Sequence, residues 1–183
     1  MNYLQSSNNL KAMNIQPTLK GELVEVRPLK PEDYDNLLRA ASDPLIWEQH
    51  PQADRWKPEV FIKHFEESLN SKGCVVIIDR KTSEIIGSTR FYDYLPENST
   101  VTIGYTFLAR KYWGGAYNRD LKKLVVNYAL QFVKATLFQV GLNNKRSQKA
   151  MERLGAINTG IEEVAISYGP PKKSYIYKIE KPF

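Results

Sequence analysis

The strongest constraint on the fold is a change in periodicity after Gly73. From there the sequence reads CVVIIDR, IIGSTRFYDYL and STVTIGYTFLAR, three β-rich runs separated by turn chemistry at residues 79–83 and 96–98. A long helix is predicted next, because its apolar residues recur at helical spacing and share one face. These residues are Leu121, Leu124, Val125, Tyr128, Ala129, Phe132 and Val133. The pattern therefore predicts an antiparallel meander followed by a helix with one buried face.

The flanking segments complete a mixed order of strands and helices. A strand over residues 21–29 precedes helices that open at Pro31 and Pro58, where proline suits the first helical turn. After the long helix, LFQVGLN reads as a strand, SQKAMERLG as a short helix, and INTGIEEVAIS and SYIYKIE as two final strands. The predicted order is β, α, α, β, β, β, α, β, α, β, β, which is typical of the α+β class.

Composition limits the class of protein further. The 183 residues, 42% of them apolar and 25% charged, fit a single domain, which we place at residues 19–183 behind a mobile tail at 1–18. One Cys and two His exclude an internal disulfide and a usual zinc cluster, so we expect no metal and a reducing, cytoplasmic location. No apolar run is long enough to span a membrane. The net charge of +6 leaves nucleic acid, an anionic surface, an anionic ligand or a solvated basic surface open.

The most informative segment joins the third meander strand to the long helix. It reads ARKYWGGAY over residues 109–117. A strand that ends in a glycine-containing turn and starts a helix exposes unpaired backbone N–H groups at the positive end of a helix dipole. Gly114 and Gly115 allow a ligand to approach the backbone closely. The turn is thus a candidate anion cradle, although such turns also occur with a purely structural role.

Two familiar phosphate loops are excluded. A Walker loop requires Gly-x-x-x-x-Gly-Lys-Ser/Thr, and a dinucleotide-binding loop requires Gly-x-Gly-x-x-Gly within a parallel βαβ unit. Neither pattern occurs in the chain. Kinase and nicotinamide-dependent functions are therefore disfavoured.

Two motifs together resemble the GCN5-related N-acetyltransferases (GNAT), and within them the RimJ/RimL-like branch that acetylates ribosomal-protein N-termini. The pyrophosphate motif Gln/Arg-x-x-Gly-x-Gly/Ala is similar to Lys111-x-x-Gly114-x-Ala116, with Lys in place of the usual first residue. A second motif matches Asn144-x-x-Ser147 and the following Met151-x-x-Leu154-Gly155-Ala156. The branch's additional features match Ile103-Gly104-Tyr105 and Trp113-Gly114. The resemblance covers roughly residues 19–180.

The resemblance implies a GNAT fold, with about seven strands in a mostly antiparallel twisted sheet and about four helices. The strand over residues 102–108 would carry a bulge and part from the strand over 137–142, so that the sheet splays between its fourth and fifth strands. The pantetheine arm of acetyl-CoA would lie in that opening like an extra strand. The implied acetyl-CoA-binding residues are Tyr105, Thr106, Phe107, Leu108, Lys111, Tyr112, Trp113, Gly114, Gly115, Ala116, Tyr117, Asn144, Arg146 and Ser147.

The implied reaction moves an acetyl group from the thioester to a primary amine in a ternary complex. It needs a neutral amine, an oxyanion donor and a proton for the leaving thiolate. The resemblance implies a backbone N–H near Phe107 as the donor, Asn144 on the pantetheine, and Ser147 near the sulfur, because Met151 holds the place of the Tyr that protonates it in many relatives. Candidate carboxylates for the amine are Glu48, Asp93 and Glu163.

Other residues are assigned from the pattern around them. Cys74 heads an apolar run and is predicted to be a buried thiol, whereas His64 is predicted to lie on the surface of its helix. Trp47, Trp56, Tyr92 and Tyr94 are candidate acceptor-pocket residues, and packing explains them equally well. The basic residues are expected near the cofactor mouth or on the outer faces of two helices. They are Lys122, Lys123, Lys145, Arg146 and Lys149.

The expected partners are acetyl-CoA or CoA and an amine, either a protein N-terminus or a small molecule, with no nucleic acid as direct ligand, no membrane, and a monomeric or homodimeric protein. The alternative is a catalytically idle domain that binds acyl-CoA. A nucleic-acid-binding module is a third reading that rests on the net charge alone. The sequence does not identify the acceptor.

Overall fold

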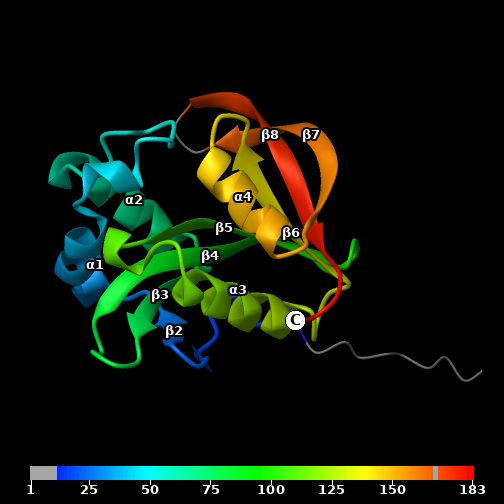
Figure 1. Cartoon of the computed structure of the whole chain (residues 1–183), viewed down its shortest axis with the longest axis horizontal. Helices are drawn as coiled ribbons and strands as arrows, with labels where there is room; N and C mark the ends of the chain where they lie inside the picture. Colours follow the sequence, from blue (N-terminus) through cyan, green and yellow to red (C-terminus); the bar gives the residue numbers. More distant parts are fainter. Residues whose placement is uncertain (1–11, 167–168) are drawn as a thin grey trace, which may run out of the picture.

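The structure is a computed structural model that describes residues 12–166 and 169–183, and within these residues the chain forms one eight-stranded sheet and four α-helices (Figure 1). The strands are β1 (Leu19–Lys20), β2 (Val24–Pro28), β3 (Cys74–Asp79), β4 (Ile85–Leu95), β5 (Thr100–Leu108), β6 (Ala135–Gly141), β7 (Ile157–Ile166) and β8 (Gly169–Ile179). The helices are α1 (Tyr34–Ala41), α2 (Pro58–Asn70), α3 (Ala116–Ala129) and α4 (Lys145–Arg153). Short 3₁₀ turns lie at Pro31–Asp33, Pro44–Ile46 and Arg110–Tyr112.

The predicted class and element order are confirmed. The strands follow the order β1-β2-β3-β4-β5-β6-β8-β7, and all neighbours are antiparallel except β5 and β6. The one addition is β1, a two-residue strand that makes eight strands where we expect seven. In Figure 1, α1 and α2 lie to the left of the sheet, α3 runs below β4 and β5, and α4 lies with β6, β7 and β8 on the right.

The central strand β3 is buried on both faces of the sheet because helices cover both. Alternate residues of β3 show this directly: Val75 and Ile77 belong to the core under α3 and α4, whereas Val76 and Ile78 belong to the core under α1 and α2. Successive side chains of a strand point to opposite faces, so a strand buried on both sides reads as a continuous apolar run. The same burial confirms the prediction for Cys74.

The sheet parts between β5 and β6. These parallel strands pair only at Thr100–Thr102 with residues 135–137, after which no pairing joins them in the described residues. β6 continues to pair with β8 as far as Gly141. Residues 103–108 of β5 and 138–141 of β6 therefore face each other as two open strand edges, as the resemblance implies.

A bulge in β5 lies at the start of the opening. Arg90 pairs with Gly104 and Ser88 with Phe107, so that two residues of β5 lie opposite one residue of β4. One of the two, Tyr105, has φ of +51°, a left-handed conformation that costs free energy for a residue with a side chain. The bulge that the resemblance implies is thus present, and it changes the direction of β5 where the strands part.

The structure differs from the sequence expectation at the N-terminal segment. Residues 1–11 of the expected tail lie outside the described residues. The following residues pack on the domain: Met13 is only 6% exposed in the core, and Gln16 Nε2 donates to the Cys74 carbonyl at 3.1 Å. The hydroxyl of Tyr128 donates to the Asn14 carbonyl at 2.8 Å. Residues 12–18 are therefore part of the packed structure rather than of a tail.

Candidate active site

The turn before α3 has the geometry of an anion cradle. Gly114 has φ of +73°, in the left-handed region that glycine adopts without a steric cost, and Gly115 is the N-cap of α3. No side chain caps this helix, so its first amides are free of a capping partner. A Cβ built on Gly114 would meet no atom within 4 Å. The turn thus presents open space, free N–H groups and the positive end of a helix dipole at one place.

Two tyrosines hold this turn from behind. The hydroxyls of Tyr112 and Tyr117 donate to the Asp79 carboxylate at 3.2 Å and 3.3 Å, and their rings lie 4.8 Å apart. Desolvation opposes ionisation of Asp79, but hydrogen bonds from the Lys81 amide, the Thr82 hydroxyl and the two tyrosines outweigh it and lower its pKa. The side chains of Tyr112 and Tyr117 are therefore bound to β3. The N–H of Tyr112 donates to the Ala109 carbonyl at 2.9 Å, so of these two residues only Tyr117 has a backbone N–H available to a ligand.

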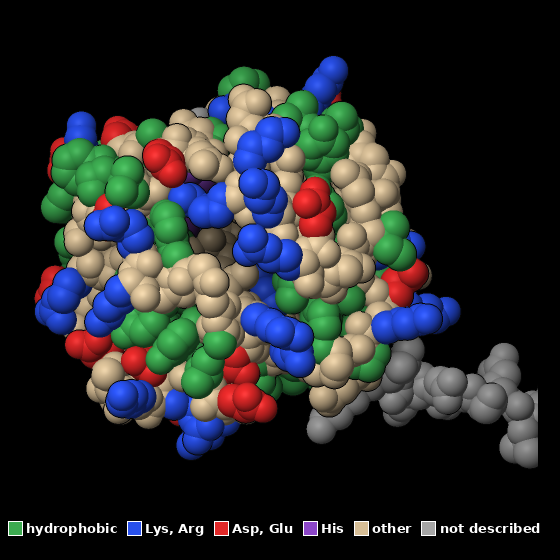
Figure 2. Space-filling view, viewed as in Figure 1, with side chains coloured by type: hydrophobic (Ala, Val, Ile, Leu, Met, Phe, Trp, Pro, Cys, Tyr) green, Lys and Arg blue, Asp and Glu red, His purple; other side chains and the backbone are tan. Residues whose placement is uncertain are grey.

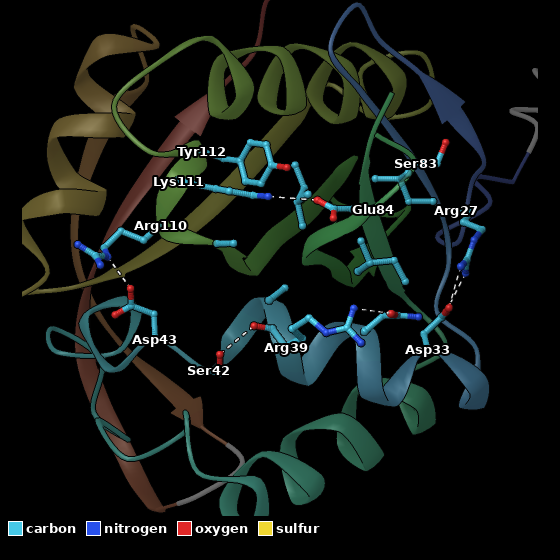
Figure 3. A pocket seen from close by; sticks show the side chains of 16 residues that line it. Arg27, Asp33, Arg39, Ser42, Asp43, Ser83, Glu84, Arg110, Lys111 and Tyr112 are labelled. Atoms are coloured by element: carbon cyan, nitrogen blue, oxygen red, sulfur yellow. Dashed lines mark hydrogen bonds and ion pairs between the residues drawn. The ribbon is translucent and has the colours of Figure 1, made fainter. Parts of the chain in front are cut away.

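The two basic residues of the turn face a separate cavity of about 760 Å³ between α1, the β3–β4 turn and residues 109–112 (Figure 3). Lys111 Nζ pairs with Glu84 at 3.1 Å, and Arg110 pairs with Asp43. Two more cavity residues, Arg27 and Asp33, form an ion pair at 2.7 Å. Lys111, which the motif places with the cofactor residues, thus has its amine on Glu84, while its backbone lies in the turn.

Arg146, at the start of α4, holds three segments together. Its guanidinium carbon lies 4.1 Å from the centroid of the Trp113 ring, and its Nη2 donates to the Ile46 carbonyl at 2.8 Å. Its Nη1 lies 3.4 Å from Glu48 Oε1, and its backbone N–H donates to Gln49 Oε1 at 3.2 Å. The start of α4, the turn before α3 and the segment of residues 45–49 therefore meet at this side chain.

The second motif forms the N-terminus of α4. Asn144 is the N-cap, and its Oδ1 accepts a hydrogen bond from the Ser147 amide at 3.1 Å. This bond occupies the side-chain oxygen, and the Nδ2 donor remains available to a ligand. Met151, one turn further on, is buried in the core. Asn144 and Ser147 thus share the first turn of α4, whereas Met151 faces inward.

The open edge of β5 has its own hydrogen-bond pattern. The Ala109 amide donates to the Ile86 carbonyl of β4 at 2.8 Å, and Phe107 lies in register with Ser88 of β4. Since backbone groups of successive residues point to opposite sides of a strand, the N–H of Phe107 also faces β4, and that of Leu108 faces the opening. The Leu108 carbonyl accepts a hydrogen bond from Trp113 Nε1 at 2.8 Å, which ties this edge to the anion cradle.

A buried lysine lies behind the opening. Lys122 of α3 is 4% exposed, and its Nζ donates to Thr106 Oγ1 at 3.1 Å and lies 4.9 Å from the centroid of the Phe138 ring of β6. Burial lowers the pKa of this amine to about 8. The prediction that Lys122 lies on the outer face of its helix or at the cofactor mouth is wrong, because α3 directs it between β5 and β6.

The three predicted carboxylates do not form a cluster. Glu48 pairs with Arg146, Asp93 is exposed on β4, and Glu163 is exposed on β7 in register with Lys173. In the described part of the chain no hydrogen bond joins any of the three to Asn144 or Ser147. The arrangement therefore shows no preformed general base built from them.

A family profile described as an acetyltransferase (GNAT) domain matches residues 24–157, which include both open strand edges and the whole of α3 and α4. The chain belongs to the GNAT acetyltransferase family. It is therefore an N-acetyltransferase, and acetyl-CoA is the acyl donor that this family uses. The mixed α/β fold predicted from the sequence is the GNAT fold.

Solved structures agree with this assignment. A GCN5-related N-acetyltransferase from Brucella melitensis is 16% identical, with a TM-score of 0.80 over 90% of this chain and 79% of that chain. A structure assigned as an acetyltransferase from T. thermophilus is 27% identical, with a TM-score of 0.73 over 90% and 89%. Mycobacterium smegmatis RimJ, in complex with CoA-disulfide, is 14% identical, with a TM-score of 0.65 over 89% and 85%. A comparison with curated proteins finds no match.

The sequence reasoning missed a group of buried basic residues on the α2 side of the GNAT sheet. Arg90 of β4 and Arg55 are almost fully buried, and His64 is 4% exposed although we expect it on the helix surface. Burial and the charges of Arg55 and Arg90 keep the pKa of His64 well below its usual value. For Arg90 a signal exists: Ser88, Arg90 and Tyr92 alternate along β4, so an arginine shares the face of its buried neighbours.

Two further features are absent from the described residues. No group of three or more His, Cys, Asp or Glu side chains in residues 12–166 and 169–183 is arranged to hold a metal ion. No helix in the same residues combines the length and the apolar character needed to cross a membrane.

Proposed function

We propose that this GNAT protein transfers the acetyl group of acetyl-CoA to a primary amine whose pKa lies near neutrality, either the α-amine of a peptide or a small amine of low pKa. The observation that carries the proposal is the uncapped N-terminus of α3, where Gly114 leaves open space beside the parted edges of β5 and β6. The acceptor class that typifies the RimJ/RimL-like branch, a protein N-terminus, is included in the proposal. The proposal also includes a cytoplasmic location. Its support is that Cys74 is the single cysteine of the sequence and is buried as a free thiol, which fits a reducing compartment.

The residues present fit acetyl-CoA. The amides of residues 114–117 would hold its pyrophosphate, because free N–H groups at a helix N-terminus bind anions. The open edges of β5 and β6 would pair with the amides of the pantetheine arm as they would with a strand. Asn144 Nδ2 is a donor for the same arm. Acetyl-CoA supplies an acetyl group activated as a thioester.

The chain's own groups would then assist attack by the amine. The N–H of Leu108 faces the opening and is the oxyanion donor in this proposal, in place of Phe107, whose N–H faces β4. Ser147 is the proton donor for the thiolate, because Met151 is buried and has no proton to give. A thiol with a pKa of about 8.5 is a good leaving group and needs little assistance.

The choice of a low-pKa amine follows from the dispersed carboxylates. About a tenth of an α-amine with a pKa near 8 is neutral at pH 7, whereas a lysine amine with a pKa near 10.4 is neutral in only about one molecule in a few thousand. An enzyme without a strong base therefore acts most efficiently on the former. Glu48 is occupied by Arg146, and Asp93 and Glu163 are exposed to solvent.

The test is release of free CoA thiol from acetyl-CoA with a panel of amines. The panel contains peptides with free N-termini, the same peptides blocked at the N-terminus but carrying an internal lysine, and small amines. We expect amine-dependent thiol release, fastest with free N-termini or low-pKa amines. Binding of acetyl-CoA by calorimetry without release from any amine would instead support the idle acyl-CoA-binding domain.

A further inference from the structure

Among the described residues, Arg90 is a buried cation without an anionic partner. It is 6% exposed on β4, and its Nη2 donates to Ser68 Oγ of α2 at 2.7 Å. Its Nε has no hydrogen-bond partner, and no carboxylate of the described residues forms an ion pair with it. A guanidinium stays charged at any physiological pH, so its burial costs free energy unless an anion compensates it.

The position of Arg90 relates it to the reaction site. It pairs in register with Gly104, which lies in the open segment of β5 at residues 103–108. Its guanidinium carbon lies 4.1 Å from the centroid of Tyr105, the bulge residue. Tyr105 packs edge-on against Tyr92, whose hydroxyl reaches across the opening to Gln139 Oε1 of β6 at 3.2 Å. Arg90 therefore lies one strand away from the opening, on its α2 side.

The surroundings of Arg90 are basic and aromatic. Arg55 lies over the Trp47 ring, with its guanidinium carbon 5.2 Å from the ring centroid, and its Nη1 lies 3.3 Å from His50 Nε2. Burial, followed by the charge of Arg55, lowers the pKa of His50 to about 3. Figure 2 shows a hollow on this face beside α4, with Lys and Arg side chains along its margin and histidine visible inside it.

A second buried side chain near Arg90 also has a polar atom without a hydrogen-bond partner. His64 of α2 lies one helical turn before Ser68, and its Nδ1 has no hydrogen-bond partner although the residue is 4% exposed. Buried polar atoms are normally paired, so two unpaired donors or acceptors on neighbouring elements suggest that a polar ligand completes the site. Since Arg90 is a cation, the ligand that suits this group is an anion.

Building on the proposed function, we propose that the acceptor is a small amine that also carries a carboxylate or a phosphate, and that Arg90 binds this anionic group. One strand spacing of about 4.8 Å separates β4 from β5, so roughly two to four bonds between the amine and the anionic group would span from the opening to Arg90. Arginine suits this role because its planar fork matches both carboxylate and phosphate oxygens.

The same charges assist the reaction itself. In water, a carboxylate or phosphate close to an amine raises the pKa of that amine. When Arg90 pairs with the anionic group, that group stabilises the ammonium less and the positive charge of Arg90 repels it, so the bound amine loses its proton more readily than it does in water. An anionic group on the acceptor offsets that repulsion for the molecule as a whole. The site thus selects the substrate by its anion and favours the neutral form of its amine.

The experiment compares matched amines that differ in one anionic group. The pairs are a free amino acid and its amide, and O-phosphoethanolamine and ethanolamine. Each is assayed by free CoA thiol release with wild-type protein, Arg90→Gln, Arg90→Lys and Arg153→Gln, and kcat/KM is expressed per concentration of neutral amine because the members of a pair differ in amine pKa. Arg153 is exposed on α4 and serves as the charge-matched control. We expect kcat/KM of the wild type to be at least tenfold higher for the anionic member of one pair. Whether this is the amino acid pair or the phosphoethanolamine pair shows whether the site prefers a carboxylate or a phosphate.

Arg90→Gln should reduce this preference to less than about twofold while KM for acetyl-CoA stays within twofold, and Arg90→Lys should keep part of it. Arg153→Gln should retain the wild-type preference. Equal rates for both members of both pairs in the wild type would overturn the inference even if Arg90→Gln does not fold. An equal loss of kcat/KM for the anionic and the neutral amine in a folded Arg90→Gln variant would overturn the inference too, because such a loss would show that Arg90 has only a structural role. No thiol release with any amine would instead contradict the proposed function.

Discussion

The guanidinium of Arg146 stacks on the indole of Trp113, with 4.1 Å between the guanidinium carbon and the ring centroid. This contact fixes the start of α4 against the turn that forms the anion cradle. The same guanidinium donates to the carbonyls of Leu45 and Ile46. The cofactor side and the acceptor side of the proposed site are therefore coupled through one side chain.

Arg146→Met tests this coupling. The substitution keeps much of the apolar stem and removes the stack and the hydrogen bonds, which together stabilise the fold by about 1 to 3 kcal/mol. We expect a loss of unfolding free energy in that range in urea and a severalfold rise of KM for both substrates. Lys149→Met, an exposed charge on the same helix, is the control. Equal unfolding free energies for the two variants would show that the contact stabilises nothing.

Gly114→Glu tests the cradle. It places bulk and negative charge where free amides face open space, at a residue with φ of +73°. We expect the affinity for CoA to fall at least tenfold, about 1.4 kcal/mol, by calorimetry. Gly160→Glu is the matched control, because Gly160 also has a positive φ and no atom within 4 Å of a built Cβ, but lies on β7. Unchanged affinity in folded Gly114→Glu would remove the cradle from the site.

Asn144 and Ser147 have separable roles. Asn144→Ala removes the cap of α4, which costs about 1 kcal/mol of stability, and also the Nδ2 donor. Asn144→Asp keeps a capping oxygen and loses only the donor. We expect both variants to raise KM for acetyl-CoA and only the first to lower stability, whereas Ser147→Ala should lower kcat more than KM. Steady-state kinetics with acetyl-CoA varied measures this, and wild-type constants for all three would exclude the motif from the mechanism.

Local patterns in the sequence predicted most of the fold. The apolar run of β3 and the helical spacing in α3 each depend on residues close in the chain, and both elements form where we expect them. The bulge and the parted strands were accessible only through the family resemblance. A two-residue strand such as β1 has too few residues for any periodicity to appear.

The site was harder to predict because its side chains meet across long sequence separations. Lys122 follows Leu121 on α3, and nothing nearby indicates that β5 and β6 part to receive its amine. Arg90 meets Ser68, 22 residues earlier in the chain, only when α2 packs on β4. Met13 becomes core because the N-terminal segment lies along the sheet. Lys122 was predicted to lie near the cofactor mouth or on an outer helix face, since burial of a charge is rare without a function or a partner.

Lys122 should make stability depend on pH. Its pKa is about 8 in the folded protein and 10.5 for an unperturbed lysine, so between these values the unfolded chain binds more protons than the folded one. The contribution of Lys122 to stability is therefore lowest below about pH 8 and rises towards pH 10.5, by up to about 3 kcal/mol. Lys122→Met should be more stable than wild type at pH 7 and lose this rise, whereas Lys123→Met, its neighbour on α3, should keep it. Urea denaturation from pH 7 to 10 measures the difference; parallel curves for wild type and Lys122→Met would contradict it.

The pH dependence of the rate should follow the pKa of the acceptor amine. His50 has a pKa of about 3 and that of His64 lies well below its usual value, so neither histidine gains a proton between pH 6 and 8. An α-amine loses its proton in this interval, and the rate with an α-amine acceptor should therefore climb across it.

Because the three carboxylates are dispersed, we also expect no enzyme carboxylate to dominate the pH dependence of the rate. Glu48→Gln, Asp93→Asn and Glu163→Gln should each lower kcat/KM by tens-fold at most, because none of the three is placed as a strong base. With acceptor amines of different pKa, the midpoint of the pH–rate profile should move with the pKa of the amine. Lys122 of the wild type also has a pKa of about 8, so Lys122→Met is the control for its titration, and this variant should show the same midpoints as the wild type. Efficient acetylation of internal lysines with a flat profile from pH 6 upward would contradict this, because it requires a preformed base in the site.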